Sequence, residues 1–260
     1  MKKPQAFSLT ELAIVMVVIS MIIAGTYTAD GLRTQFKIQS IISEYQYYSR
    51  AIRSFQTQYN YLPGDFPYAG ALWGLPATNN CTNAVVTAGC NGNGNGTLNN
   101  WNLFGGEGIR SWQHMSLAGM IAGNFNGNNN TIPNSIPSLK VQGSAIEFRQ
   151  ATLTVFDGAG SSNYLTIGGL RTDATNYGLS TQTGGTYAGA TGNFLNVLEA
   201  QSIDTKIDDG IAYSGTILGV GNAVLGLATA CSYAWTDVTS ANYQVQNPGS
   251  LCSLMSKWNE

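Results

Sequence analysis

The chain has 260 residues, of which only 10% are charged, against about 25% in an average soluble domain. Its formal net charge of −2 excludes a broadly basic surface of the kind that binds nucleic acid. Glycine is abundant at 31 residues, and uncharged polar residues are frequent, a composition common in exported proteins. The length allows one medium-sized domain with an anchor, or two small lobes.

The N-terminal segment is the most informative part of the chain. Lys2 and Lys3 precede an apolar run at residues 7–24, and Glu11 is the only charged residue between positions 4 and 29. A helix of this length crosses a hydrocarbon core of about 30 Å, and the two lysines place its start in the cytoplasm. A carboxylate within such a segment costs roughly 2.5 kcal/mol or more, so Glu11 requires a partner. A cleaved secretory signal or a plain signal anchor would leave Glu11 unexplained.

Residues 6–12, Ala-Phe-Ser-Leu-Thr-Glu-Leu, resemble the leader junction of type IV pilins and type II secretion pseudopilins. The resemblance implies cleavage between Ala6 and Phe7 by a membrane aspartic peptidase, followed by N-methylation of Phe7. It also implies that Glu11 is an assembly carboxylate, which pairs with the cationic amine of a neighbouring subunit in a low-dielectric filament core. In the alternative interpretation Glu11 only favours the helix N-terminal dipole, which is worth about 0.3–1 kcal/mol.

Two departures from the family pattern indicate which kind of family member the chain resembles. Ala6 stands where the family usually has glycine, and no proline interrupts the chain between Pro4 and Pro63. Because major pilins commonly carry a proline late in the apolar segment, the sequence favours a minor pilin or a pseudopilin.

Apolar residues continue beyond the anchor at alternating three- and four-residue steps from Ile38 to Tyr59. This period predicts one long helix over residues 7–59, and Leu62-Pro63-Gly64-Asp65 ends it. The expected organisation is a leader at 1–6, a transmembrane and assembly helix at 7–29, an amphipathic half of the same helix at 30–62, and a globular head at 63–260.

The head is expected to be α+β, with the long helix packed on an antiparallel sheet as the pilin resemblance implies. Residues 64–110 are rich in glycine and asparagine and predict a long loop. The segment after this loop, residues 111–121, predicts a short helix whose His114, the only histidine, has a structural role. The remaining predicted elements are strands at 145–156, 164–170, 211–218 and 228–235 and a helix at 193–207.

Four cysteines form two local pairs, Cys81 with Cys90 and Cys231 with Cys252. Three pairings are open, and we favour the sequential one because it closes short loops. Two disulfides fit an exported head, whereas the lack of a Cys-x-x-Cys or a histidine cluster argues against zinc.

Asp204, Asp208 and Asp209 lie close together beside Gly210. Their hard oxygens are suitable ligands for Ca²⁺, and some pseudopilins bind calcium in C-terminal loops. The spacing does not match an EF-hand, and Asp-Asp-Gly is also an ordinary turn. Calcium is therefore the one cofactor considered, and the turn is the alternative.

Three functions follow from these observations. The first is a non-enzymatic structural subunit of a type IV pilus or a type II secretion pseudopilus. Its partners would be other subunits, the prepilin peptidase and methyltransferase, and the inner-membrane assembly platform, with the head in the periplasm or on the cell surface. The second is a tip adhesin or DNA-uptake pilin with a basic patch at Lys140, Arg149 and Arg171. The third, an anchored exported enzyme, is supported by no nucleophile–base motif or metal cluster.

Overall fold

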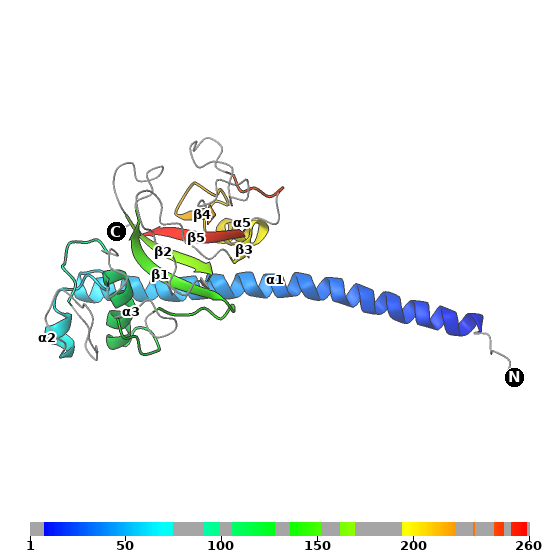
Figure 1. The fold of residues 1–260 in the computed structure, drawn as a ribbon, viewed down its shortest axis with the longest axis horizontal. Helices are drawn as coiled ribbons and strands as arrows, with labels where there is room; N and C mark the ends of the chain where they lie inside the picture. Colours follow the sequence, from blue (N-terminus) through cyan, green and yellow to red (C-terminus); the bar gives the residue numbers. More distant parts are fainter. Residues whose placement is uncertain are drawn as a thin grey trace, which may run out of the picture. The chain divides into compact units, whose positions relative to one another are not determined.

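A computed structural model describes residues 8–74, 91–98, 106–127, 136–151, 162–169, 194–221, 231, 242–246 and 251–258. The chain divides into two compact units, Met1–Gln39 and Ser40–Glu260. The long helix α1 (Leu9–Tyr59) contributes residues to both units (Figure 1). The predictions that concern the leader at 1–6, Phe7, Arg171 and the Cys81–Cys90 pair lie outside the described residues.

Helix α1 ends where the sequence predicts. Its last residue is Tyr59, and Asn60 adopts a left-handed φ of 59° while its N–H donates to Gln56 O at 2.8 Å. A left-handed residue directly after a helix is a common C-terminal stop, and asparagine tolerates it better than most residues. Pro63 then follows within four residues and prevents the helix from resuming.

The described part of the head contains one antiparallel sheet, which confirms the α+β, pilin-like fold class. Its strands are β1 (Ser144–Ala151), β2 (Ser162–Gly169), β3 (Leu195–Asn196), β4 (Ile217–Gly221) and β5 (Leu251–Trp258). The order is β1-β2-β5-β3, and β4 also pairs with β5. Strand β5 therefore pairs with three other strands. Its Leu254 lies opposite Ile167 of β2, and its Met255 lies opposite Leu218 of β4.

The part of α1 inside the head lies along one face of this sheet (Figure 1). Tyr45 Oη and Ser256 Oγ share a hydrogen bond of 2.7 Å, and Trp258 Nε1 donates to Gln56 Oε1 at 3.3 Å. The guanidinium of Arg53 lies 5.2 Å from the centre of the Trp258 ring. Several α1 side chains of the predicted stripe are completely buried, namely Ile41, Ile52 and Phe55. The stripe is thus a core-packing face.

Three short helices complete the described part of the head: α2 (Ala69–Trp73), α3 (Glu107–Leu117) and α5 (Val197–Ile207). Helix α3 is displaced toward the N-terminus from its predicted position at 111–121, because Gly106 is its N-cap and Gly119 follows it with a φ of 70°. Helix α5 begins later than predicted because Asn196 caps it. Asn196 Oδ1 accepts from Glu199 N at 2.8 Å, and Glu199 Oε2 accepts from Asn196 N at 3.0 Å.

Two strand predictions need correction. The strand expected at 211–218 begins only at Ile217, because residues 211–216 form turns in which Gly215 has a φ of 68°. Strand β5 was not predicted at all. The strand expected at 228–235 lies outside the described residues except for Cys231, and the residues predicted beyond Ala151 in β1 lie outside them too.

Strand β1 carries a buried pair of opposite charges. Glu147 and Arg149 are two residues apart and therefore share a face of the strand. They are 5% and 4% exposed, and Arg149 Nε lies 3.8 Å from Glu147 Oε2. Burial raises the pKa of Glu147 to about 7, and this effect outweighs the lowering by Arg149. The predicted basic surface patch is therefore wrong in its central member, since Arg149 does not reach the surface.

Glu147 makes the stability of the head depend on pH. In the unfolded chain its carboxyl loses its proton near 4.5, whereas the folded chain keeps the proton up to about 7. The free energy of unfolding should therefore fall as the pH rises through this interval, by about 3 kcal/mol for a shift of this size. Guanidinium unfolding of the full chain in detergent, at several pH values from about 4 to about 8, measures this slope.

Glu147→Gln should flatten the slope, because the amide does not titrate. Asp30→Asn is the matched control, since Asp30 lies on α1 with its side chain 79% exposed, and it should leave the slope unchanged. Equal slopes in the parent chain and in Glu147→Gln would show that Glu147 does not hold a proton in the folded state.

Candidate functional site

The first candidate site is the N-terminal end of α1. Ser8 is the residue before the helix, and its N–H donates to Glu11 Oε2 at 2.8 Å. In return, Glu11 N–H donates to Ser8 Oγ at 3.2 Å. This reciprocal pair is a capping box, which satisfies backbone donors that a helix leaves open at its start.

The capping box gives Glu11 a role that the prediction of an assembly carboxylate did not include. The pattern Ser-x-x-Glu at residues 8–11 is its sequence signature and would have revealed it. A carboxylate has about four acceptor positions, and Ser8 occupies one of them. Glu11 therefore retains acceptor capacity for a cationic partner while it caps its own helix.

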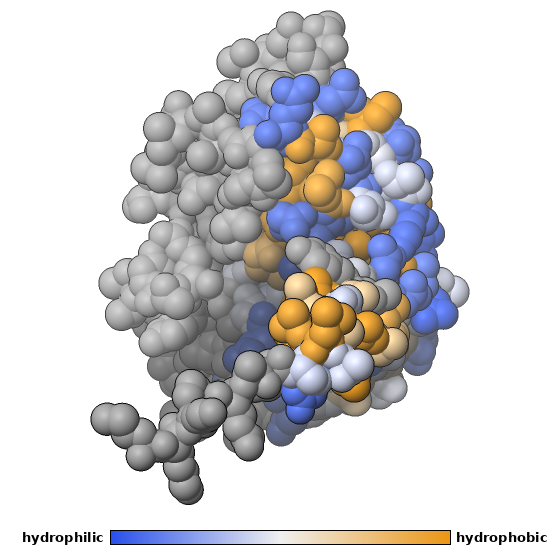
Figure 2. All heavy atoms as spheres, turned by 90° about the vertical axis from the view of Figure 1, so that its right-hand side faces the viewer, coloured by the Kyte–Doolittle hydropathy of each residue, from blue (hydrophilic) through white to orange (hydrophobic). Residues whose placement is uncertain are grey.

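Helix α1, which contains Glu11 in its first turn, is long and apolar enough to cross a membrane. It contains an 18-residue window with a mean hydropathy of 2.2, and none of that window is buried. Leu9 is 85% exposed and Met21 is 70% exposed. Figure 2 faces the side on which Figure 1 draws the N-terminus, and apolar side chains lie uncovered there. Uncovered apolar surface of this length fits insertion into lipid followed by packing against other apolar helices.

The second candidate site lies in the C-terminal part of the head. Cys231 and Cys252 form a disulfide across 21 residues, which confirms this half of the predicted sequential pairing. Gln244 N–H donates to Cys231 O at 3.0 Å. The adjacent Tyr243 is 2% exposed, and its Oη donates to Asp204 Oδ2 at 2.9 Å. The disulfide and this hydrogen bond connect residues 242–246 to β5 and α5.

The structure brings together the three carboxylates that the sequence placed near each other. One oxygen from each of Asp204, Asp208 and Asp209 lies within 4.8 Å of the others. Asp204 is completely buried, and this burial raises its pKa to about 7. Its Oδ1 accepts no hydrogen bond from any residue that the structure describes.

In each of the other two acids, one carboxylate oxygen accepts hydrogen bonds from backbone N–H groups. Asp208 Oδ2 accepts from the N–H groups of Thr216 and Ile217, and Asp209 Oδ1 accepts from Ile211 N at 2.8 Å. These bonds shape the turn that leads into β4, as the alternative interpretation expects. The unsatisfied Asp204 Oδ1 beside two further carboxylates nevertheless fits a hard cation, which prefers several oxygen ligands.

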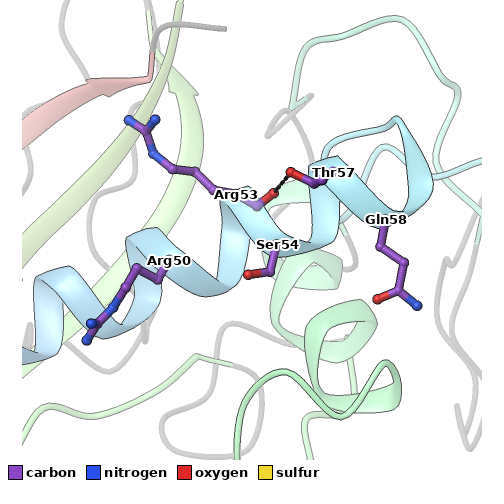
Figure 3. Close-up of a pocket in the computed structure, with 5 residues that line it drawn as sticks. All are labelled: Arg50, Arg53, Ser54, Thr57 and Gln58. Atoms are coloured by element: carbon purple, nitrogen blue, oxygen red, sulfur yellow. Dashed lines mark hydrogen bonds between the residues drawn. The ribbon is translucent and has the colours of Figure 1, made fainter.

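A shallow hollow of about 470 Å³ lies along the part of α1 inside the head, lined by Arg50, Arg53, Ser54, Thr57 and Gln58. Figure 3 shows that these side chains point to different sides of the helix. Thr57 Oγ1 donates to Arg53 O at 2.8 Å, so this hydroxyl serves the helix itself. None of the five is an acid, a histidine or a cysteine, and their polar groups do not converge on one point. The hollow therefore has no arrangement suited to acid–base or nucleophilic chemistry.

His114 has the structural role that the sequence indicated. It is completely buried in α3, and its Nδ1 accepts from Gly64 N at 3.0 Å. Its ring lies 6.3 Å from that of Phe55 and 5.7 Å from that of Trp73. These contacts fasten the turn after α1 to α3.

A comparison with known protein families gives a match at the N-terminal end of the chain. Residues 1–27 match the prokaryotic N-terminal methylation motif, which includes Ala6, Phe7, Glu11 and the first part of α1. Neither a comparison with curated proteins nor one with solved structures found a match. The motif, the exposed apolar helix and the antiparallel head agree with one another. The chain carries, at residues 1–27, the N-terminal leader signature of the type IV pilin and pseudopilin family.

Proposed function

We propose that this chain is a non-enzymatic structural subunit of a type IV pilus or a type II secretion pseudopilus. The observation that carries the proposal is the methylation motif at residues 1–27, joined to a helix whose apolar side chains are exposed. In this scheme the chain enters the inner membrane once, with its head in the periplasm. A prepilin peptidase then cuts between Ala6 and Phe7, and Phe7 is methylated.

Assembly then follows from the physics of α1. An apolar helix leaves lipid at little cost only if it enters another apolar environment, and a bundle of identical helices provides one. A neighbour's Phe7 amine would neutralise Glu11 there, since two opposite charges are tolerated in a dry core only as a pair. The inner-membrane platform would bring the subunits together. The continuous segment without proline supports a minor subunit or pseudopilin over a major pilin.

Mass spectrometry of the N-terminus of the chain purified from membranes tests the proposal directly. We expect a terminal N-methylated Phe7, with residues 1–6 removed. A matched variant, Phe7→Ala, should be processed but leave a different terminal residue, which checks the assignment of the cleavage position. An intact Met1 in the parent chain, or a cut near Ala29, would refute the proposed processing.

We further propose that Asp204, Asp208 and Asp209 bind Ca²⁺ in the head. The support is the buried Asp204 Oδ1 that accepts no hydrogen bond from the described residues, set among carboxylate oxygens within 4.8 Å. Bound Ca²⁺ would tie the end of α5 to the turn before β4. Through the Tyr243 bond to Asp204 it would also tie α5 to residues 242–246.

Calorimetric titration of the full chain in detergent with CaCl₂, after treatment with EDTA, measures this binding. We expect one site per chain, a rise in the unfolding temperature with Ca²⁺, and loss of both in Asp209→Asn. Asp209 is chosen because its side chain is exposed and its replacement leaves the core intact. Glu199→Gln, in the first turn of α5 and not among the three acids, is the control and should bind Ca²⁺ normally. If the parent chain shows neither binding heat nor a shift in unfolding temperature, the three acids do not bind Ca²⁺ and only shape the turn before β4.

A further inference from the structure

One further surface of the head combines an exposed tyrosine ring, Tyr68, and a half-buried one, Tyr61, with exposed amides. It lies where the chain leaves α1, passes through α2 and returns in the loop at residues 91–98, and we call it the aromatic–amide surface (Figure 1). Its members are Tyr61, Tyr68, Leu72, Asn93 and Asn95. Tyr68 and Leu72 are 58% and 52% exposed, and both asparagines are exposed.

The two tyrosines contact each other, and Tyr61 also lies against the loop. The ring centres of Tyr61 and Tyr68 are 6.1 Å apart at an interplanar angle of 75°, so the edge of one ring meets the face of the other. Gly94 has a φ of 72° and lies so close to Tyr61 that a Cβ there would come within 3.3 Å of the ring. Tyr61 therefore connects the Tyr68 ring to the loop that carries both asparagines.

Buried charged groups hold the loop in place. Asp65 is 1% exposed, and its carboxylate accepts from Gly94 N at 2.6 Å, Gly96 N at 2.7 Å and Asn95 N at 3.1 Å. Glu107, also buried, accepts from Asn93 N at 2.9 Å. Bonds from a carboxylate to several backbone N–H groups are strong. The loop is thus fixed before any partner arrives, which lowers the entropic cost of binding.

The same geometry orients the asparagine side chains. Asn93 Oδ1 accepts from Asn95 N at 3.0 Å, and Asn95 Oδ1 accepts from Thr97 N at 2.9 Å. Each amide carbonyl is therefore used within the loop. The amide nitrogens at the other end of these exposed side chains each carry two donor hydrogens. The surface presents hydrogen-bond donors beside aromatic rings.

The charge of the surface selects the class of partner. Its five members are uncharged, and the charged residues that support it, Asp65, Glu107 and Arg110, are at most 6% exposed. Fixed loops rich in tyrosine, asparagine and glycine are typical of binding surfaces, because tyrosine offers rigid contact area and asparagine offers hydrogen bonds. Ring faces match the C–H faces of a pyranose, and amide donors match its hydroxyl groups.

We infer that the aromatic–amide surface binds a neutral oligosaccharide. This activity goes beyond the structural role proposed above, and it belongs to the unassembled chain as well as to a filament. A filament that carries this chain would attach to a neutral polysaccharide.

The test uses the full chain in a zwitterionic detergent, since detergents with sugar headgroups would compete. Calorimetric titrations with cellohexaose, maltohexaose, mannohexaose and chitohexaose cover neutral sugars of different geometry, and hexagalacturonate is the acidic comparison. We expect at least one neutral sugar to bind and hexagalacturonate to bind more weakly. Tyr68→Ala should weaken the affinity for the neutral sugar about tenfold, as expected for the loss of a stacked ring.

Two further variants separate binding from folding. Asn93→Asp keeps the oxygen that accepts from Asn95 N and removes the amide donors, so we expect about fivefold weaker binding in an intact fold. Tyr68→Phe keeps the ring and should stay within about threefold of the parent chain. Leu198→Ala, at an apolar residue of α5 that is 50% exposed, is the control outside the surface and should not change the affinity.

The inference is overturned if no neutral sugar of the panel binds, if hexagalacturonate binds best, or if Tyr68→Ala and Asn93→Asp bind as tightly as the parent chain. These titrations require no filament. Their failure is therefore distinct from a failure of leader cleavage or assembly, which the N-terminal mass measures.

Discussion

Replacing Glu11 with alanine should leave the chain in the membrane and remove it from filaments. The expected loss is large, because deleting one partner of a buried ion pair costs about 3–5 kcal/mol and leaves the other charge unpaired. This corresponds to more than about a hundredfold in an assembly equilibrium. The measurement is the amount of tagged chain in sheared filaments relative to membranes, determined by quantitative immunoblotting.

The capping box makes a sharper control available. Glu11→Ala removes both the charge and the cap to Ser8 N, whereas Glu11→Gln keeps a side-chain oxygen that can cap the helix. If the charge drives assembly, Glu11→Gln should fail as Glu11→Ala does. Ser8→Ala weakens only the cap, by about 1 kcal/mol, and should still assemble.

Normal filament incorporation of Glu11→Gln would assign Glu11 to capping alone. Normal incorporation of Glu11→Ala would remove Glu11 from assembly altogether. Both outcomes leave the cleavage at Ala6 open to its own test.

The second large effect is expected from the disulfide between Cys231 and Cys252. Replacing both cysteines with serine should lower the free energy of unfolding of the head by about 3–5 kcal/mol, because the closed loop restricts the unfolded chain and the bond secures the most connected strand. Guanidinium unfolding of the full chain in detergent, followed by tryptophan fluorescence, measures the change. The replacement of Cys81 and Cys90 with serine is the comparison. The predicted disulfide between these two cysteines would close a shorter loop, so its removal should cost less.

Dithiothreitol provides an independent check. It should destabilise the parent chain and have less effect on the chain that lacks Cys231 and Cys252. A loss below about 1 kcal/mol in that variant would mean that β5 is held by the sheet and needs no covalent support.

The sequence predicted the features that depend on local patterns. Helix α1 follows from the apolar period between Ile38 and Tyr59, and its end follows from Pro63. Glu11 stood out because it is a charge within an apolar run. The disulfide at Cys231 followed from spacing and from the export signal. Each of these signals can be read from the order of residues along the chain, without knowledge of contacts between distant segments.

Strand β5 escaped prediction because its polar residues are buried through partners far away in the sequence. Ser253 is completely buried and its Oγ donates to Val220 O at 3.1 Å, while Ser256 is satisfied by Tyr45. Both residues interrupt the apolar pattern that marks a strand. The same reason hid the burial of Arg149, since a charged residue is expected at the surface unless a partner such as Glu147 is known.

The hydrogen bonds that hold the loop at 91–98 in place could not be predicted from the sequence either. A run of asparagine and glycine predicts a loop, but Asp65 lies about thirty residues before the N–H groups that it binds. Only the folded chain brings them together. The candidate carbohydrate site depends on this contact, whereas the Asp204, Asp208 and Asp209 group is local and was recognised from spacing.

The position of β5 in the sheet sets the order of events in biogenesis. Among the described strands, β3 and β4 reach the sheet only through β5, and β2 pairs with β5 across more than eighty residues. The part of the sheet that the structure describes cannot be completed until residues 251–258 have been synthesised and, in the proposed scheme, have crossed the membrane. Pairing across such long separations is slow because a large loop must close first. In the proposed scheme, a newly exported chain passes through a period in which α1 is already inserted while the edges of its sheet are open. We expect the chain to depend most on periplasmic chaperones and on oxidation of its cysteines during this period.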